Sequence, residues 1–168
     1  MCTKLKKNKG SERHVIGKGT QAALDMYRCA EDVVFDKEKI RDILEEAADR
    51  FSLKELALYA TENDEGDDFC FVMLCTNGHL FLHVFPTYGY VEADIFTLES
   101  GANPEQVAVF LRQEFGPDQS KLTTLKRGDY GSIKDMKPQR KKMVKTMRRA
   151  KNAGAKLKKF MTWKNTKE

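Results

Sequence analysis

His79 and His83, in the middle of the chain, are well suited to acid–base or metal chemistry. They lie in an apolar run, residues 79–85, that is typical of a β-strand. At about 3.3 Å per residue, their side chains share a face but stand about 13 Å apart, too far for one zinc ion. His83 is therefore open to two interpretations: a core histidine with satisfied hydrogen bonds, or a general acid or base.

The cysteines have no spacing typical of a metal site, so we expect no bound metal. Cys70 and Cys75 belong to the apolar run Phe69–Cys75, where thiols act as small hydrophobes with a raised pKa rather than as nucleophiles. Residues 17–20 (GKGT) lack the glycine spacing of a phosphate-binding loop.

The elements that must position these residues follow from hydrophobic periodicity. Asp36 is expected to cap a helix over residues 37–51, and Asn103 a second helix that begins at Pro104 and ends before Gly116. Strands are predicted over residues 14–27, 53–61, 69–75, 79–85, 91–98 and 122–126. The order β-α-β-β-β-α-β predicts an α+β domain of two layers.

Two features of the central strands bear on assembly. Asn77-Gly78 between two apolar runs predicts a hairpin with a type I′ turn, in which both central residues have positive φ. The runs are apolar on both faces, and one layer of helices covers only one face of a sheet. We therefore expect a homodimer whose interface lies near residues 69–75 and 79–85.

The 168 residues carry a net charge of +5 that is unevenly distributed. Residues 133–168 hold 14 lysines and arginines against two acids, and residues 1–19 hold six against one. The span 20–132 is therefore acidic, with a net charge of −12. The sequence predicts a disordered basic arm (1–13), a folded domain (14–132) and a basic amphipathic helical tail (133–168).

The basic tail, and residues 136–168 in particular, has three candidate partners. Its lysines and arginines suit nucleic-acid phosphates, and Phe160, Met161 and Trp163 would add apolar contacts on an anionic membrane surface. The third partner is the acidic domain of the same chain or of a neighbour. No export signal and no apolar run of about 20 residues is visible, so a cytoplasmic location is expected.

The region from residue 78 to residue 97 resembles one known family. The resemblance is carried by Gly78-His79-Leu80, His83-x-x-Pro86-x-Tyr88-Gly89-Tyr90 and Asp94-Ile95-Phe96-Thr97. This pattern is similar to ESHLxIHxWPExGYxxxDxFTCG of the short prokaryotic S-adenosylmethionine decarboxylases, pyruvoyl enzymes of spermidine synthesis. The similarity covers residues 13–130 and implies an α+β sandwich whose protomers pair sheet to sheet.

The resemblance implies roles for five positions. In the family, a serine hydroxyl attacks the carbonyl of the preceding glutamate, and the serine becomes a pyruvoyl group that serves as electron sink. The glutamate position falls on Asn77 and the serine position on Gly78, while the processing histidine falls on His83. A further processing serine falls on Cys70, and the cysteine that donates a proton falls on Leu98.

Glycine has no nucleophile, so this comparison implies a non-catalytic or regulatory homologue that forms no pyruvoyl group and uses no cofactor. Its partners would be an active paralogue, or an S-adenosylmethionine-like or polyamine ligand. A shifted register, with Cys75 or Thr76 as the processed residue, is the alternative within the family. The alternative function is nucleic-acid binding through the basic tail.

Overall fold

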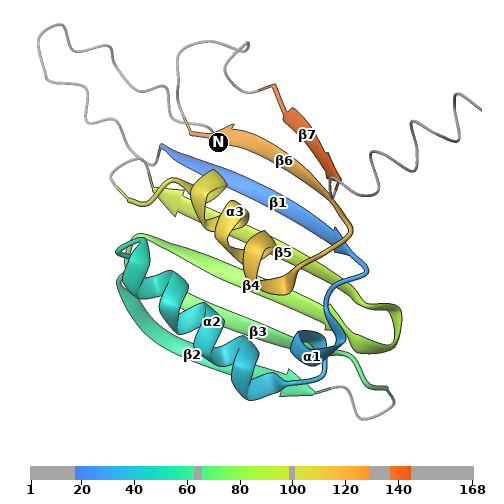
Figure 1. Ribbon diagram of the computed structural model, residues 1–168. Helices are drawn as coiled ribbons and strands as arrows, with labels where there is room; N and C mark the ends of the chain where they lie inside the picture. The colour runs from blue at the N-terminus through green and yellow to red at the C-terminus, as the bar shows by residue number, and fades with distance from the viewer. Residues whose placement is uncertain (1–17, 63–65, 99–100, 129–136, 145–168) are drawn as a thin grey trace, which may run out of the picture.

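The computed structural model describes residues 18–62, 66–98, 101–128 and 137–144. They form one antiparallel sheet of seven strands in the order β2-β3-β4-β5-β1-β6-β7 (Figure 1). The strands are β1 (Gly19–Tyr27), β2 (Glu55–Glu62), β3 (Phe69–Cys75), β4 (Gly78–Phe85), β5 (Tyr90–Leu98), β6 (Gln119–Arg127) and β7 (Gln139–Val144). The helices are α1 (Glu31–Val34), α2 (Lys37–Arg50) and α3 (Pro104–Phe115), with a 3₁₀ turn at Pro86–Tyr88.

The two long helices, α2 and α3, lie over the same face of the sheet, here called the helix face (Figure 1). Alternate strand residues point into this layer and form the core, among them Leu24, Phe71, Leu82 and Ile95, each at most 1% exposed. The period of two along each strand matches the predicted alternation. The predicted α+β architecture of two layers is confirmed.

The opposite face of the sheet carries no helix among the described residues, and we call it the open face. On β2 and β3 its side chains are Tyr59, Val72 and Leu74, of which Tyr59 is 61% exposed and Leu74 is 45% exposed. The strands are thus apolar on both faces, as predicted, but within one protomer only the helix face is fully buried.

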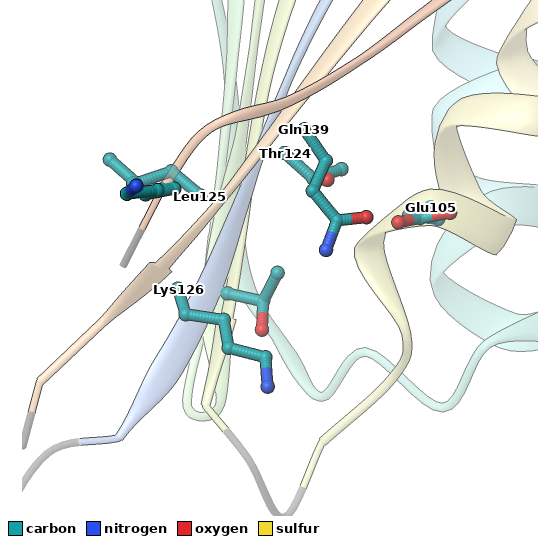
Figure 2. A pocket seen from close by; sticks show the side chains of 7 residues that line it. Glu105, Thr124, Leu125, Lys126 and Gln139 are labelled. Atoms are coloured by element: carbon teal, nitrogen blue, oxygen red, sulfur yellow. The ribbon is translucent and has the colours of Figure 1, made fainter. Parts of the chain in front are cut away.

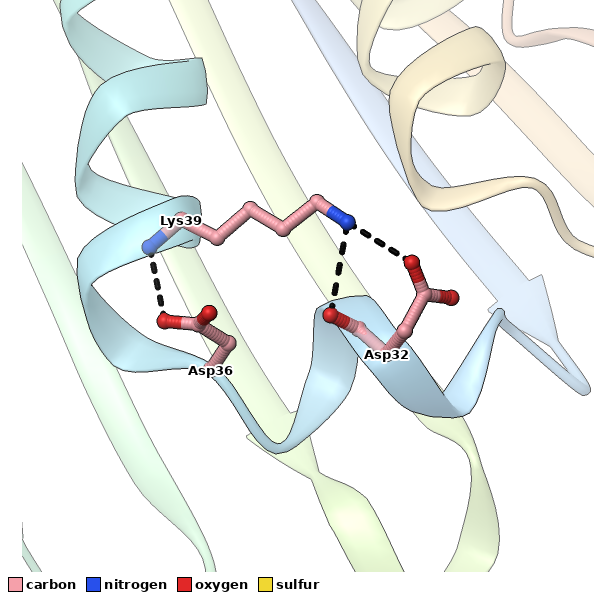
Figure 3. A network of polar contacts seen from close by, with 3 residues as sticks. All are labelled: Asp32, Asp36 and Lys39. Atoms are coloured by element: carbon pink, nitrogen blue, oxygen red, sulfur yellow. Dashed lines mark hydrogen bonds and ion pairs between the residues drawn. The ribbon is translucent and has the colours of Figure 1, made fainter.

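Polar contacts join the short helix α1, which the sequence did not predict, to α2 (Figure 3). The Asp36 carboxylate accepts a hydrogen bond of 3.0 Å from the Lys39 amide, which confirms the predicted N-cap. The Lys39 ammonium donates to Asp32 at 2.7 Å, and this bond lowers the pKa of the Asp32 carboxyl. Because these contacts fix the chain entering α2, the apolar stripe of that helix faces the sheet.

The caps of α3 are also as predicted. The Asn103 side chain accepts from the Glu105 amide at 2.9 Å, and Pro104 is the first helical residue. Gly116 ends the helix with a φ of +56°, a left-handed conformation that favours glycine.

The predicted type I′ turn at Asn77-Gly78 is wrong. Cys75 and Gly78 are paired residues of β3 and β4, so the two loop residues are Thr76 and Asn77. No residue from 75 to 78 has positive φ. Gly78 is the first residue of β4, and its backbone conformation is one that other residues also adopt.

The predicted C-terminal helix is wrong for residues 139–144, which form the strand β7 on β6. Met143 packs against the core, while the first four residues of β7 are exposed. The predicted arm, residues 1–13, and the tail residues 133–136 and 145–168 lie outside the described residues. None of the described helices has the length and apolar character needed to cross a membrane.

Candidate functional site

Asn77 ties three segments together at the β3–β4 turn. Its side chain accepts from the Lys54 amide at 3.3 Å and donates to the Ser52 carbonyl at 3.2 Å. Its backbone carbonyl accepts from the Leu98 amide at 2.8 Å. The position where the family resemblance expects a glutamate is therefore occupied by an amide that serves as a structural bridge.

Gly78 lies directly beside β5, paired with Thr97. A Cβ on Gly78 would overlap the carbonyl oxygen of Phe96, and would lie 3.0 Å from the carbonyl carbon of Phe96 and 3.1 Å from the Cα of Thr97. These are backbone atoms, which cannot rotate away as a flexible side chain would. The backbone geometry thus leaves no room for a side chain at this position.

Cys70 and His83 form the second group of predicted site residues. They are direct cross-strand partners on β3 and β4 and share the open face. The His83 Nε2 lies 3.9 Å from a carboxylate oxygen of Asp68, and its ring packs on Phe85 with centroids 4.8 Å apart. His83 is half-buried, so it is neither the enclosed core histidine nor a fully solvated side chain.

The structure does not bring the five predicted residues into one site. Asn77, Gly78 and Leu98 meet at one end of β4, whereas His83 lies five residues along the strand, about 16 Å away. By alternation, position 78 belongs to the helix face and position 83 to the open face. Within one protomer, the histidine does not reach the turn.

A pocket lies near Leu98 on the helix face. Figure 2 shows Thr124, Lys126 and Gln139 gathered in the space between the sheet and the start of α3, opposite Glu105. An adjoining hollow shares Glu105 and Lys126 and is lined by Thr97, Leu98 and Gly101. Glu105 is already engaged, because the Lys141 ammonium donates to it at 2.5 Å. The polar groups here offer hydrogen bonds but no nucleophile paired with a base.

Sequence analysis missed a cluster on the open face, centred on Tyr90. Its hydroxyl lies 3.1 Å from a carboxylate oxygen of Asp25 and 3.2 Å from one of Glu92, and its single proton is shared between these two acceptors. Its ring stacks on those of Tyr27 and Phe85. Burial, followed by the two carboxylates, raises the pKa of the Tyr90 hydroxyl. The alternation along β5 could have predicted part of this cluster, because it places Glu92 and Asp94 on the same face of the strand as Tyr90.

Aromatic faces beside carboxylates are suited to an organic cation, because both attract positive charge.

Residues 20–128 match the family model described as S-adenosylmethionine decarboxylase. The chain belongs to the S-adenosylmethionine decarboxylase family. The matched stretch ends at the end of β6, so β7 lies beyond it.

Similar proteins agree with this membership. The S-adenosylmethionine decarboxylase proenzyme of Archaeoglobus fulgidus is 27% identical over 117 residues, covering 69% of this chain and 96% of the relative. That of Prochlorococcus marinus is 30% identical over 109 residues, covering 65% of this chain and 86% of the relative. The adenosylmethionine decarboxylase of Aquifex aeolicus has a similar fold, with a TM-score of 0.61 and 19% identity, covering 69% of this chain and 97% of that chain.

The close approach at Gly78 predicts a large cost for any side chain there. Gly78→Ser should lower the free energy of unfolding by about 2 kcal/mol or more, because its Cβ displaces the β5 backbone. Denaturant unfolding measures this difference. Ala60→Ser, at an exposed position of β2, is the control and should change stability by less than about 0.5 kcal/mol. Equal stability of the two variants would show that the turn opens freely.

The Cys70 thiol is predicted to be a slow nucleophile. Burial raises its pKa, and the Asp68 and Glu92 carboxylates add to this effect, while a hydrogen bond with Thr61 opposes it. A raised pKa leaves less thiolate at neutral pH, so alkylation should be slower than for glutathione and should still accelerate above pH about 9. Peptide mass spectrometry after iodoacetamide pulses measures both rates. Faster labelling of Cys70 than of glutathione at neutral pH would contradict the prediction.

Proposed function

We propose that this chain is a non-catalytic member of the S-adenosylmethionine decarboxylase family with a role linked to spermidine and other polyamines. The observation that carries the proposal is the turn at Gly78. The residue has no hydroxyl or thiol from which an ester or a pyruvoyl group forms, and the Phe96 carbonyl occupies the space of a side chain. Residue 78 has no side chain from which a pyruvoyl group could form, and we propose that the protein works without a cofactor.

The neighbouring positions support the same proposal. Leu98 has no proton to give to a reacting carbon, although its amide contacts Asn77. The alternative of a shifted register is disfavoured because burial raises the pKa of the Cys75 thiol and so weakens it as a nucleophile. Thr76, the other alternative, donates its amide to the Lys54 carbonyl at 2.9 Å within the same bridged turn.

For the ligand, we propose an organic cation bound on the open face near Tyr90. The carboxylates of Asp25 and Glu92 stand beside the stacked rings of Tyr27, Tyr90 and Phe85. The sulfonium of an S-adenosylmethionine-like molecule and the ammonium groups of a polyamine share the chemistry that such a surface recognises.

For assembly, we propose that the open face of β2–β4 pairs with the same face of a second copy, or of an active paralogue in the cytoplasm. Tyr59, Val72, Leu74 and Phe81 form an apolar area there, with Tyr59 and Leu74 largely exposed in one protomer. Covering such an area removes apolar surface from water, which stabilises a complex by about 25 cal/mol per Å².

The proposed loss of self-processing predicts a single intact chain. The purified protein should have one mass, 19.2 kDa as the sequence requires, and should release no CO₂ from carboxyl-labelled S-adenosylmethionine. Intact-mass spectrometry and the release assay measure these two properties. Two fragments, the C-terminal one blocked at its amino end, would overturn the proposal.

The proposed interface makes opposite predictions for two phenylalanines. Phe81→Asp, on the open face, should give a folded monomer in analytical ultracentrifugation, because the charge would be buried between the sheets. Phe71 faces the helices and is 1% exposed, so Phe71→Asp should unfold the chain instead.

A matched control is Val109→Asp, at an exposed position of α3 on the other side of the molecule, which should leave the dimer intact. A monomeric wild-type chain at micromolar concentration would contradict the proposed pairing.

A further inference from the structure

Strands β6 and β7 form a strongly basic ribbon at one edge of the sheet. Among their residues are six lysines and arginines on exposed positions of the two strands, and Lys137 precedes β7. Neither strand contains an acidic residue. We define the basic ribbon by its exposed cations: Lys121, Lys126, Arg127, Lys137, Arg140, Lys141 and Lys142.

The register of the two strands crowds like charges. Lys121 is paired directly with Lys142, and Arg140 follows two residues earlier on the same face. Like charges opposite one another destabilise a sheet, so this arrangement costs folding free energy unless an anion lies between them. On the helix face Lys141 pairs with Glu105, and on the open face the Lys121 ammonium donates to the Tyr27 hydroxyl at 3.0 Å. The Glu105 carboxylate therefore lies on the side of the sheet away from the crowded Lys121 and Lys142.

Two aromatic rings border the ribbon on the open face. The Lys121 ammonium lies 4.9 Å from the ring centre of Tyr27, and the Arg127 guanidinium lies 5.6 Å from that of Phe96. Rings interleaved with cations are typical of surfaces on which the bases of a single-stranded nucleic acid stack while its phosphates meet lysine and arginine.

We propose that the basic ribbon binds the phosphate backbone of a single-stranded nucleic acid. The ribbon lies outside the turn at Gly78 and borders the cluster at Tyr90, with which it shares Tyr27. The proposed binding of nucleic acid does not rest on the function proposed above. An anionic membrane is a poorer partner, because the large exposed apolar side chains of the described residues all lie on other elements.

Protection of a sheet edge by lysines explains only part of the pattern. Edge strands often carry lysine to prevent pairing with another chain, and β7 is such an edge. β6, however, is an interior strand between β1 and β7, and it holds three of the exposed cations. The sequence beyond β7 continues the same charge, with nine lysines and arginines against one acid in residues 145–168.

The test is the salt dependence of RNA binding by the full chain. Fluorescence anisotropy of a labelled RNA of about 20 nucleotides gives the binding constant between about 50 and 250 mM KCl. The ribbon variant combines Arg127→Gln, Arg140→Gln and Lys142→Gln, all on the open face. The control, with equal net charge, combines Lys37→Gln, Arg41→Gln and Arg50→Gln on α2.

We expect the ribbon variant to lose at least about tenfold in affinity at the lowest salt, with a log–log salt slope smaller by about 2, since each phosphate contact contributes about 0.7. The α2 control should keep the wild-type slope. Equal losses in the two variants would reduce the effect to net charge and overturn the proposal.

The other outcomes also decide against it. If the ribbon variant bound RNA with the affinity of the wild-type protein, the ribbon would be excluded as the RNA-binding surface. Ribbon-dependent pelleting with phosphatidylserine vesicles, without RNA binding, would assign the surface to a membrane. A ribbon-dependent change of oligomeric state, again without RNA binding, would assign it to a second copy of the chain.

Discussion

The contact between the first residue of β4 and the backbone of β5 constrains the rest of this molecule. Gly78 approaches the Phe96 carbonyl so closely that only a hydrogen atom fits in place of a side chain. Asn77 then closes the turn by bonding to Ser52, Lys54 and Leu98. At the turn where the family resemblance places the bond that breaks, the chain has a hairpin in which the side-chain oxygen, the side-chain nitrogen and the backbone carbonyl of Asn77 each have a structural partner. The same register of β4 on β5 places His83 opposite Glu92.

The open face divides into three chemical zones across the sheet. Apolar residues such as Leu74 occupy β2–β4, carboxylates and stacked rings around Tyr90 occupy β5 and β1, and lysines such as Lys121 occupy β6 and β7. The strong charge asymmetry of the sequence is thus partly expressed within one surface. Each zone favours a different class of contact: burial against another sheet, attraction of a cation, or attraction of a phosphate.

The sequence allowed most of the fold to be predicted because its periodicities are local. The caps Asp36 and Asn103 and the strands around Phe69–Cys75 depend on residues close in the chain, and the structure has them. The prediction of the turn type was wrong because Asn-Gly is a local signal for positive φ. Here position 78 requires glycine for another reason, which is that the backbone of the distant strand β5 occupies the space of a side chain. The Tyr90 cluster was missed because its partner Asp25 lies 65 residues away, and strand order fixes that meeting. Residues 139–144 formed a strand because β6 offered an unpaired edge, which outweighed their helical periodicity.

The addition of β7 moves the boundary of the folded sheet beyond the stretch that matches the family model. β6 donates and accepts backbone hydrogen bonds along six paired positions with β7, and Met143 packs against the core. A chain cut after residue 128 would leave the β6 edge bare, with a row of unsatisfied amides and carbonyls beside apolar residues such as Leu122 and Leu125. Such an edge recruits other strands. A piece of this protein that ends at residue 128 therefore exposes a strand edge that a piece extending to Val144 keeps paired.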